Sequence, residues 1–292
     1  MSIYNKALTA NNIISESRLA ISESRLLLTY LANIKLEKLL SHPETKLKPS
    51  IYRNFKKLEK KRLSGWPIAY LIGNKEFYGY PFKVSRAVLI PRPETEMIVD
   101  LSTELFKTKP YDIIIDIGTG SGAIIISLTR ELKRLSPARL KKVNLRATDI
   151  SAPALKIARE NATLNQVSRN IIFKRGNLLK PFLSNLKKFN YHQLLITANL
   201  PYLTPWQIAT SSSIQKEPKL ALDGGLDGLD LYRKLFQQVA EINTGTKITM
   251  ILEIDPSQSQ LIMKLASQHI PFSTSEIIKD LAGKKRFTLI KR

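Results

Sequence analysis

The stretch DIIIDIGTGSGAIIISLTRELKRL, residues 112–135, decides the fold class. It opens with a short apolar run typical of a buried strand and closes with the apolar spacing of a helix. Between the two, Gly118, Gly120 and Gly122 allow the backbone to turn tightly and to approach a ligand closely. A strand, a glycine loop and a helix in this order predict a ligand-binding loop at the carboxyl end of a strand, with a tight structural turn as the alternative.

Strands and helices alternate from this unit to the end of the sequence. Predicted strands cover 112–116, the run IIFKR, 143–149, 192–199, 247–254 and two segments of the tail. Predicted helices cover 96–107, 122–135, 151–166, 229–242 and 256–268, with Thr95 as the expected cap of the first. This alternation predicts an α/β fold with a mostly parallel sheet.

Residues 1 to about 63 have helical spacing and little Gly or Pro. A heptad occurs twice, as ISESRLA (14–20) and ISESRLL (21–27), and predicts one amphipathic helix. After this region, EFYGYPFKV (76–84) and AVLIP (87–91) are two β-like runs that predict a hairpin. We therefore expect a helical domain at 1–75, a β-hairpin linker at 76–92 and an α/β domain at 93–292.

Composition excludes several classes of site. The chain has no cysteine and three histidines far apart in sequence, so we expect neither a metal site nor a cysteine nucleophile. Its 46 basic and 24 acidic residues give a net charge of +22, which favours an anionic partner such as RNA or a ribosome; a lysine-rich genome is the alternative. No signal peptide or membrane span is recognisable, so we expect a cytosolic protein, and we expect a monomer.

Two motifs beyond the glycine loop indicate chemistry. Asp149 ends the second predicted strand, where a carboxylate can accept hydrogen bonds from ribose hydroxyls; capping the next helix is the alternative. Asn199, Leu200, Pro201 and Tyr202 follow the apolar strand LLITA. This tetrad resembles the Asn/Asp-Pro-Pro-Tyr/Phe signature of methyltransferases that use S-adenosylmethionine to methylate planar nitrogens.

The tetrad suits a nitrogen whose lone pair is delocalised. The side-chain oxygen of Asn199 and the carbonyl of Leu200 can each accept one N–H, which orients the nitrogen toward a methyl donor. Tyr202 can stack on the flat group. Glu253, at the end of the strand KITMILEI, could be catalytic by position, although we expect a structural role for it.

Three longer stretches resemble the release factor glutamine methyltransferases. They are GWPIAYLIGNKEFYGYPFKVSRAVLIPRPETEMIV (65–99), EPKLALDGGLDGLDLYRKL (217–235) and KDLAGKKRF (279–287). The resemblance implies a Rossmann-like methyltransferase sheet behind a small helical domain and a hairpin linker. It also implies methyl transfer from S-adenosylmethionine to the side-chain amide of the Gly-Gly-Gln glutamine of a peptide-chain release factor.

The resemblance also implies roles for single residues. Those implied to contact the cofactor are Gly118, Thr119, Gly120, Ser121, Gly122, Asp149, Asn177, Leu178 and Asn199. Those implied to clamp the substrate amide are the tetrad Asn199, Leu200, Pro201 and Tyr202, with Arg92, Glu94 and Thr95 bordering the site. Two positions depart from the family pattern. Leu200 replaces a proline and loses rigidity, and Asn177 replaces an acidic residue and loses charge assistance toward the adenine amino group.

Three other functions compete with this interpretation. An NLPY tetrad is also typical of ribosomal RNA adenine dimethyltransferases, and together with the charge of +22 it favours adenine methylation on RNA or DNA. A glutamine methyltransferase acting on a ribosomal protein would use the same chemistry. A non-catalytic protein that binds RNA or the ribosome is the third, and the intact glycine loop and Asn199 oppose it.

Overall fold

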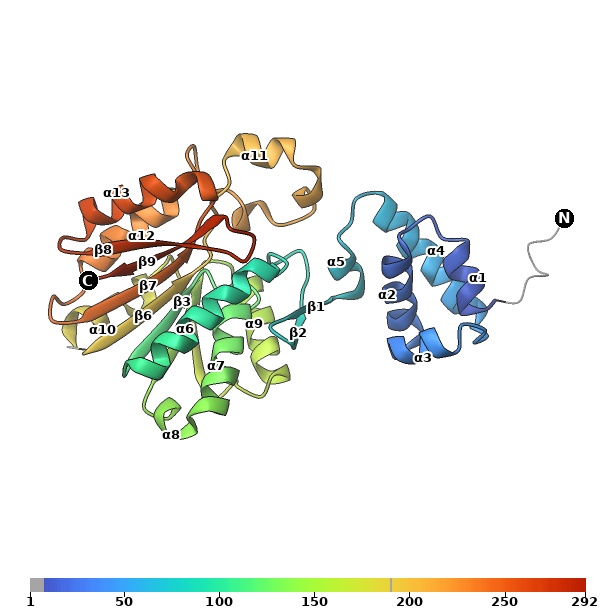
Figure 1. Cartoon of the computed structure of the whole chain (residues 1–292), viewed down its shortest axis with the longest axis horizontal. Coiled ribbons are helices and arrows are strands. Elements are labelled where there is room, and N and C mark those ends of the chain that lie inside the picture. The colour runs from blue at the N-terminus through green and yellow to red at the C-terminus, as the bar shows by residue number, and fades with distance from the viewer. Residues whose placement is uncertain (1–7, 190) are drawn as a thin grey trace. The chain divides into compact units, whose positions relative to one another are not determined.

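The computed structural model describes residues 8–189 and 191–292. The chain divides into two compact units, Met1–Gly73 and Asn74–Arg292, which are described separately (Figure 1). In the part of the chain that is described, no helix is both long and apolar enough to cross a membrane.

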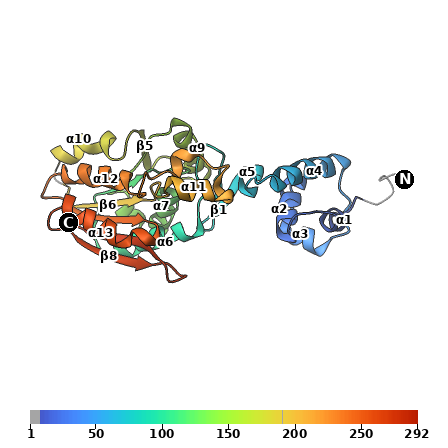
Figure 2. The same cartoon turned by 90° about the horizontal axis from the view of Figure 1, so that it is seen from above.

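The N-terminal unit is a small helical bundle (Figure 2). Its helices are α1 (Ala10–Ser15), α2 (Ile21–Ala32), α3 (Leu36–Ser41), α4 (Pro49–Leu63) and α5 (Ile68–Ile72). Leu27 and Leu28 of α2 and Phe55 of α4 are fully buried and form the centre of its core. The predicted helical character of this region is thus confirmed.

The repeated heptad does not form one helix, so that prediction is wrong. The second copy begins α2, whereas the first copy ends α1 at Ser15 and then leaves the helix. In that break, the Ser17 hydroxyl and the Arg18 backbone N–H donate to Oε1 of Glu59 on α4, at 2.9 and 2.7 Å. Identical residues therefore fold differently because only the first copy lies against a buried carboxylate.

The hairpin lies earlier than predicted. Its strands are β1 (Asn74–Phe77) and β2 (Tyr80–Lys83), both inside or next to the first predicted run, and AVLIP is irregular. The reversal occurs at Tyr78 and Gly79, with φ of 54° and 71°, because two consecutive residues at positive φ make the tight turn that suits a hairpin. The side chain of Asn161 in α9 (Ala152–Leu164) accepts a hydrogen bond from the backbone N–H of Lys83 at 2.7 Å and donates one to the Lys83 carbonyl at 3.0 Å. These two hydrogen bonds fix the hairpin to α9.

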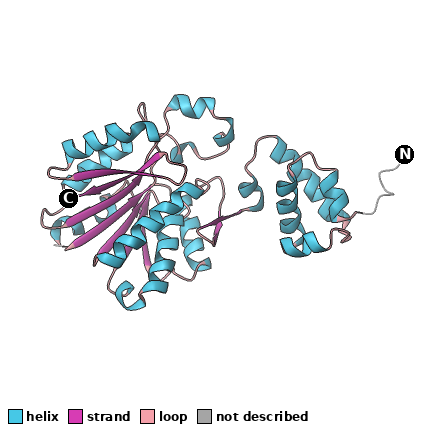
Figure 3. Ribbon diagram, in the orientation of Figure 1, coloured by secondary structure: helices cyan, strands magenta, loops and turns pink. Residues whose placement is uncertain are grey.

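The C-terminal unit is built on a seven-stranded sheet of order β5-β4-β3-β6-β7-β9-β8 (Figure 3). The strands are β3 (Ile113–Ile117), β4 (Asn144–Asp149), β5 (Ile171–Arg175), β6 (Gln193–Ala198), β7 (Lys247–Glu253), β8 (Thr274–Lys279) and β9 (Lys285–Lys291). The first five in sequence are parallel, and β9 pairs antiparallel with both β7 and β8. The predicted α/β fold with a mostly parallel sheet is confirmed.

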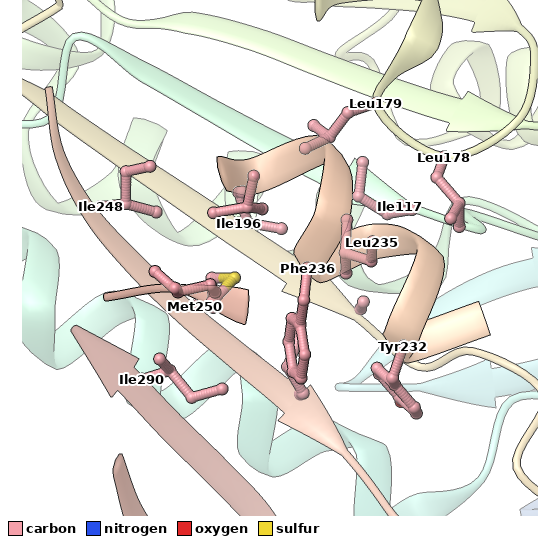
Figure 4. Packing of buried hydrophobic residues seen from close by; sticks show 14 of the residues in the cluster. Ile117, Leu178, Leu179, Ile196, Tyr232, Leu235, Phe236, Ile248, Met250 and Ile290 are labelled. Atoms are coloured by element: carbon pink, nitrogen blue, oxygen red, sulfur yellow. The ribbon is translucent and has the colours of Figure 1, made fainter. Parts of the chain in front are cut away.

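Helices cover both faces of this sheet. One apolar cluster joins it to α6 (Glu96–Thr108), α7 (Ala123–Leu135) and α9, and the other joins it to α10 (Lys180–Lys188), α12 (Asp230–Ala240) and α13 (Ser259–His269). The second cluster contains Leu235 and Phe236 of α12 together with Ile196 of β6, all of them buried (Figure 4). Shorter helices are α8 (Pro137–Leu140) and α11 (Pro205–Thr210).

The topology brings the predicted site residues together. Sequence order reverses between β3 and β6, because β4 and β5 lie on one side of β3 whereas β6 and β7 lie on the other. Ligands of open α/β sheets bind beyond the carboxyl ends of strands at such a point. The glycine loop follows β3, Asp149 ends β4 and Asn199 follows β6.

Candidate active site

The glycine loop is closely packed where it leaves β3. Gly118 and Gly122 have φ of +68° and +83°, a region that other residues rarely adopt. A Cβ on Gly118 would lie 2.9 Å from Cδ2 of Leu200, and one on Gly122 would lie 2.6 Å from Cδ1 of Ile126. The backbone conformation therefore favours glycine at both positions, and a Cβ at either would require the end of a neighbouring side chain to move.

Asp149 holds this loop from the neighbouring strand. Its Oδ2 accepts a hydrogen bond from the Gly120 N–H at 2.8 Å, and its Oδ1 accepts one from the Ser151 N–H at 2.8 Å. Burial raises the pKa of Asp149. The cap of α9 is Ser151 itself, whose hydroxyl accepts from the Ala154 N–H at 3.2 Å. Asp149 thus supports both the loop and the start of the helix and still borders the cavity described next.

A cavity of about 660 Å³ lies at these strand ends. The predicted cofactor residues that line it are Gly118, Thr119, Gly120, Ser121, Asp149, Asn177, Leu178 and Asn199. Gly122 is not among the lining residues and instead begins α7. The structure thus gathers nearly the whole predicted set around one cavity.

A second cavity of about 180 Å³ adjoins the first on the side of the tetrad. Asn199, Leu200 and Pro201 line both cavities, and so does Arg92. Tyr202 lines only the smaller one, while Glu94 lines neither and is exposed. The tetrad therefore forms the boundary between a large and a small compartment.

A hydrogen-bonded cluster fixes the side chain of Asn199. Its Nδ2 donates to Oγ1 of Thr95 and to Oε2 of Glu253, both at 3.0 Å. The Thr95 hydroxyl donates to the same Glu253 oxygen at 2.6 Å. Thr95 precedes α6 as predicted, but its side chain makes no capping hydrogen bond, because this cluster uses its hydroxyl.

The same carboxylate also holds the tetrad's tyrosine. The Tyr202 hydroxyl donates to Oε1 of Glu253 at 3.2 Å. Burial raises the pKa of Tyr202, and the neighbouring Glu253 charge raises it further, so the phenol stays protonated. Burial likewise raises the pKa of Glu253, against the hydrogen bond from Thr95 and the charge of Arg286.

Further contacts of the site come from α12 and from the loop before it. The Leu200 N–H donates to the Tyr232 hydroxyl at 3.3 Å, and that hydroxyl donates to the backbone carbonyl of Glu253. Arg92 pairs with Glu217, whose side chain is 1% exposed and also accepts from the Ile90 N–H at 3.2 Å. The ion pair holds Arg92 at the edge of both cavities.

Comparisons with known proteins agree with this geometry. Residues 5–73 match the family model of the PrmC N-terminal domain, and residues 93–199 match that of ribosomal protein L11 methyltransferase (PrmA). A release factor glutamine methyltransferase of Moorella thermoacetica is 34% identical, over 92% of this chain and 90% of the relative. The one of Bacillus subtilis is 31% identical over 97% and 96%. This chain belongs to the release factor glutamine methyltransferase family.

Solved structures share the fold of this methyltransferase. The hMettl16 catalytic domain, in complex with a 3′UTR hairpin, is 15% identical with a TM-score of 0.52 over 84% of this chain and 81% of that one. A human methyltransferase 10 domain containing protein is 16% identical with a TM-score of 0.50 over 81% and 96%. At these identities the likeness shows the Rossmann-like methyltransferase fold alone.

Family membership implies use of S-adenosylmethionine, and the larger cavity suits it. Gly118 and Gly120 line the cavity without side chains to fill it, and the Asp149 carboxylate supplies acceptors for hydroxyl groups. At the two family departures, Asn177 lines the cavity with an amide, and Leu200 is buried against Gly118.

The structure adds two residues to the predicted set. Glu253, for which a structural role was expected, makes its contacts inside the site, where it binds Asn199, Thr95 and Tyr202. Its position offered a signal, because Glu253 is the last residue of β7 and the parallel register pairs Ala198 with Leu252. Asn199, the first residue of the tetrad, therefore comes next to Glu253. Glu217 was not singled out, because nothing local marks a buried partner for Arg92.

Proposed function

We propose that this chain transfers a methyl group from S-adenosylmethionine to the side-chain amide nitrogen of the glutamine in the Gly-Gly-Gln motif of a peptide-chain release factor. One observation carries the proposal. Both hydrogens of the Asn199 amide are bound by Thr95 and Glu253, and among the described residues its Oδ1 has no hydrogen-bond partner. An unpaired acceptor thus stands on the wall shared by the two cavities.

The chemistry follows from that acceptor. A carboxamide nitrogen is a weak nucleophile because its lone pair is delocalised into the carbonyl. The Asn199 Oδ1 and the Leu200 carbonyl accept the two N–H groups of the substrate, which orients the nitrogen and stabilises positive charge that develops on it. When bound, S-adenosylmethionine supplies an electrophilic methyl group on a sulfonium sulfur. The substrate nitrogen would gain a bond to the methyl carbon as the carbon–sulfur bond of the sulfonium breaks to leave a neutral thioether. The nitrogen would give up one proton to water, so no strong base is required.

The compartments suggest how the two reactants are separated. We place the cofactor in the larger cavity beside the glycine loop and Asp149, and the glutamine side chain in the smaller one, with Tyr202 as its flat wall. The helical N-terminal unit, which matches the PrmC N-terminal domain, is our proposed docking domain for the release factor. A monomer in the cytosol remains the predicted setting.

A labelling competition tests the proposal. The pure protein is incubated with methyl-labelled S-adenosylmethionine, a release factor from the same organism and total RNA, and the label is located by mass spectrometry. We expect label on the Gly-Gly-Gln glutamine and about a hundredfold slower labelling with Asn199→Ala. Label on a glutamine of a ribosomal protein would show a ribosomal protein methyltransferase, and label on adenine would show a nucleic acid methyltransferase. Failure to bind S-adenosylmethionine would favour a non-catalytic protein that binds RNA or the ribosome.

An RNA contact has one structural observation in its favour. Arg53, Lys57, Lys60 and Lys61 are exposed on α4 at spacings that place them on one helical face. The neighbouring Lys56 is instead paired with Glu59, at 2.9 Å. We propose that this basic face contacts phosphates while the site acts on its protein substrate.

Salt dependence tests that contact. Changing Arg53, Lys57 and Lys60 to Glu should weaken RNA binding and reduce its salt slope by about one for each phosphate contact removed. Changing the exposed Lys133, Lys141 and Lys142 of the other unit to Glu is the matched control. Equal losses in both triple variants would show that net charge alone attracts RNA.

A further inference from the structure

Glu253 is a buried carboxylate that the proposed reaction does not consume. It ends β7, is 1% exposed and binds Asn199 and Tyr202 of the tetrad, which we propose to clamp the substrate. Thr95 is equally enclosed, at 4% exposed, and comes from the start of α6 on a separate part of the chain. We propose that Glu253 and Thr95 form a positioning pair that holds the Asn199 amide with its oxygen toward the substrate. The inference rests on the proposed function of Asn199.

Counting hydrogens shows why the pair selects one orientation. Thr95 has a single hydroxyl hydrogen, and it goes to Oε2 of Glu253 at 2.6 Å. Thr95 Oγ1 can therefore only accept from Asn199, and a carboxylate likewise only accepts. The two hydrogens of Nδ2 are donated to these two acceptors, and each hydrogen bond has a nitrogen–oxygen distance of 3.0 Å.

The opposite orientation is disfavoured for the same reason. Turning the Asn199 amide by half a turn would place Oδ1 against the oxygens of Thr95 and Glu253, and would replace two hydrogen bonds with two contacts between lone pairs. It would also present a donor to a substrate nitrogen that has only donors to offer. An asparagine without this pair would populate both orientations, and only one of them binds the substrate amide productively.

Charge adds to the orientation. A carboxylate behind Nδ2 draws the amide hydrogens toward it and increases electron density on Oδ1, and the effect is strong in a buried cluster. Charged or titratable groups near Glu253 include Arg286, Glu94, Tyr202 and Tyr232. As the substrate nitrogen becomes positive, an electron-rich Oδ1 stabilises it.

The pair also reaches the other side of the substrate compartment. Oε1 of Glu253 accepts from the Tyr202 hydroxyl at 3.2 Å, and its backbone carbonyl accepts from Tyr232, which in turn binds the Leu200 N–H. One residue thus links Asn199, Leu200 and Tyr202, so it sets the relative positions of all three. This makes Glu253 a positioning residue, since it acts through residues that contact the substrate.

Isosteric variants of Thr95 test the pair. Thr95→Val removes the hydroxyl and keeps the shape, and we expect kcat to fall about tenfold or more with the cofactor Kd little changed. Thr95→Ser restores the hydroxyl and should restore kcat. Thr103→Val is the matched control, because Thr103 is a buried threonine of α6, the helix that Thr95 precedes, and its hydroxyl has no hydrogen-bond partner among the described residues. It should leave kcat unchanged.

A double-mutant cycle tests whether the pair acts through Asn199. Glu253→Gln can keep an oxygen toward Thr95 and Asn199 but loses the charge and the acceptor of the Tyr202 hydroxyl, and we expect kcat to fall about tenfold or more at saturating substrate. In an Asn199→Ala background, Thr95→Val should not lower kcat further, and Glu253→Gln, which also contacts Tyr202, should lower it by a smaller factor than in the wild type. Additive losses, or equal kcat losses for Thr95→Val and Thr95→Ser, would overturn the proposal.

The readout separates this proposal from the proposed function. The cycle is run on whichever nitrogen takes the label in the wild-type competition. Label on adenine with a non-additive cycle would reject the release factor as substrate and keep the positioning pair. Label on glutamine with an additive cycle would keep the release factor as substrate and reject the positioning pair.

Discussion

The Asp149 carboxylate accepts a hydrogen bond from the Gly120 N–H at 2.8 Å. The side chain predicted to hold a ribose therefore also fastens the glycine loop to the end of the neighbouring strand. Its second oxygen accepts from the Ser151 N–H, so one carboxylate links β4, the loop after β3 and the start of α9. Cofactor affinity and local stability should consequently depend on the same residue.

Asp149→Ala should weaken S-adenosylmethionine binding. Losing hydrogen bonds to a charged group costs about 1.5–3 kcal/mol each, which corresponds to roughly a tenfold to hundredfold loss of affinity. Calorimetric titration measures it. Asp112→Ala is the matched control. Asp112 also accepts hydrogen bonds from two backbone N–H groups, those of His192 and Gln193, but it lies at the amino ends of the strands, away from the cavity. The control should lower stability and leave the Kd unchanged; an unchanged Kd for Asp149→Ala would refute the ribose assignment.

Asn199→Ala should lower turnover far more than cofactor affinity. The side chain orients the substrate nitrogen, and removing such a group costs about a hundredfold or more in kcat. Single-turnover methylation and a separate cofactor titration measure the two quantities. Asn144→Ala, at the amino end of β4, should change neither. Near-wild-type turnover in Asn199→Ala would contradict the proposed mechanism.

Stability should depend on pH through Asp116. Burial raises its pKa to about 7, although hydrogen bonds from Thr119 and Thr197 oppose the shift. In the unfolded chain the pKa is about 4. Between these values the native state holds a proton that the unfolded state has lost, so this residue's contribution to the free energy of unfolding falls as pH rises and is fully lost above about pH 7.

Asp116→Asn should remove that dependence. Between about pH 5 and about pH 8, we expect wild type to lose stability relative to Asp116→Asn. The relative loss in the free energy of unfolding is at most about 1.4 kcal/mol per pH unit. Urea unfolding at the two pH values measures the difference. Parallel pH profiles for the two proteins would show that Asp116 titrates normally.

The departure at Leu200 predicts a coupling with Tyr232. Tyr232→Phe removes the acceptor of the buried Leu200 N–H, at a cost of about 1–3 kcal/mol. Leu200→Pro removes the N–H itself, so the double variant should cost less than the sum of the single variants by about 1 kcal/mol. Urea unfolding of the four proteins gives the coupling. Simple additivity would mean that this hydrogen bond contributes nothing to stability.

Much of the candidate site was predictable because its motifs are local. Gly118 and Gly120 lie directly between a strand and a helix, and Asp149 and Asn199 each stand at a strand end. Parallel strands bring their carboxyl ends to one edge, so local patterns sufficed to gather these residues. The cavity contains them together, and the family comparison supports the interpretation.

Other features needed contacts that no local pattern records. The two copies of the heptad fold differently because Glu59, more than thirty residues later in sequence, binds only the first. The hairpin turns at Tyr78, where an aromatic residue at positive φ is tied to α6 through a hydrogen bond to Glu96 at 2.8 Å. In both places a distant side chain outweighed the local preference.

The sequence by itself determined the α/β fold, the order of its strands and helices, and the tetrad that marks a nitrogen methyltransferase, because each depends on neighbouring residues and on periodicity. Only the tertiary structure decided which atoms of the tetrad are available. Thr95 and Glu253, 158 residues apart, meet at one oxygen and bind the Asn199 amide hydrogens. Hydrogen-bond direction depends on where donors and acceptors lie in space, and the order of residues does not specify it.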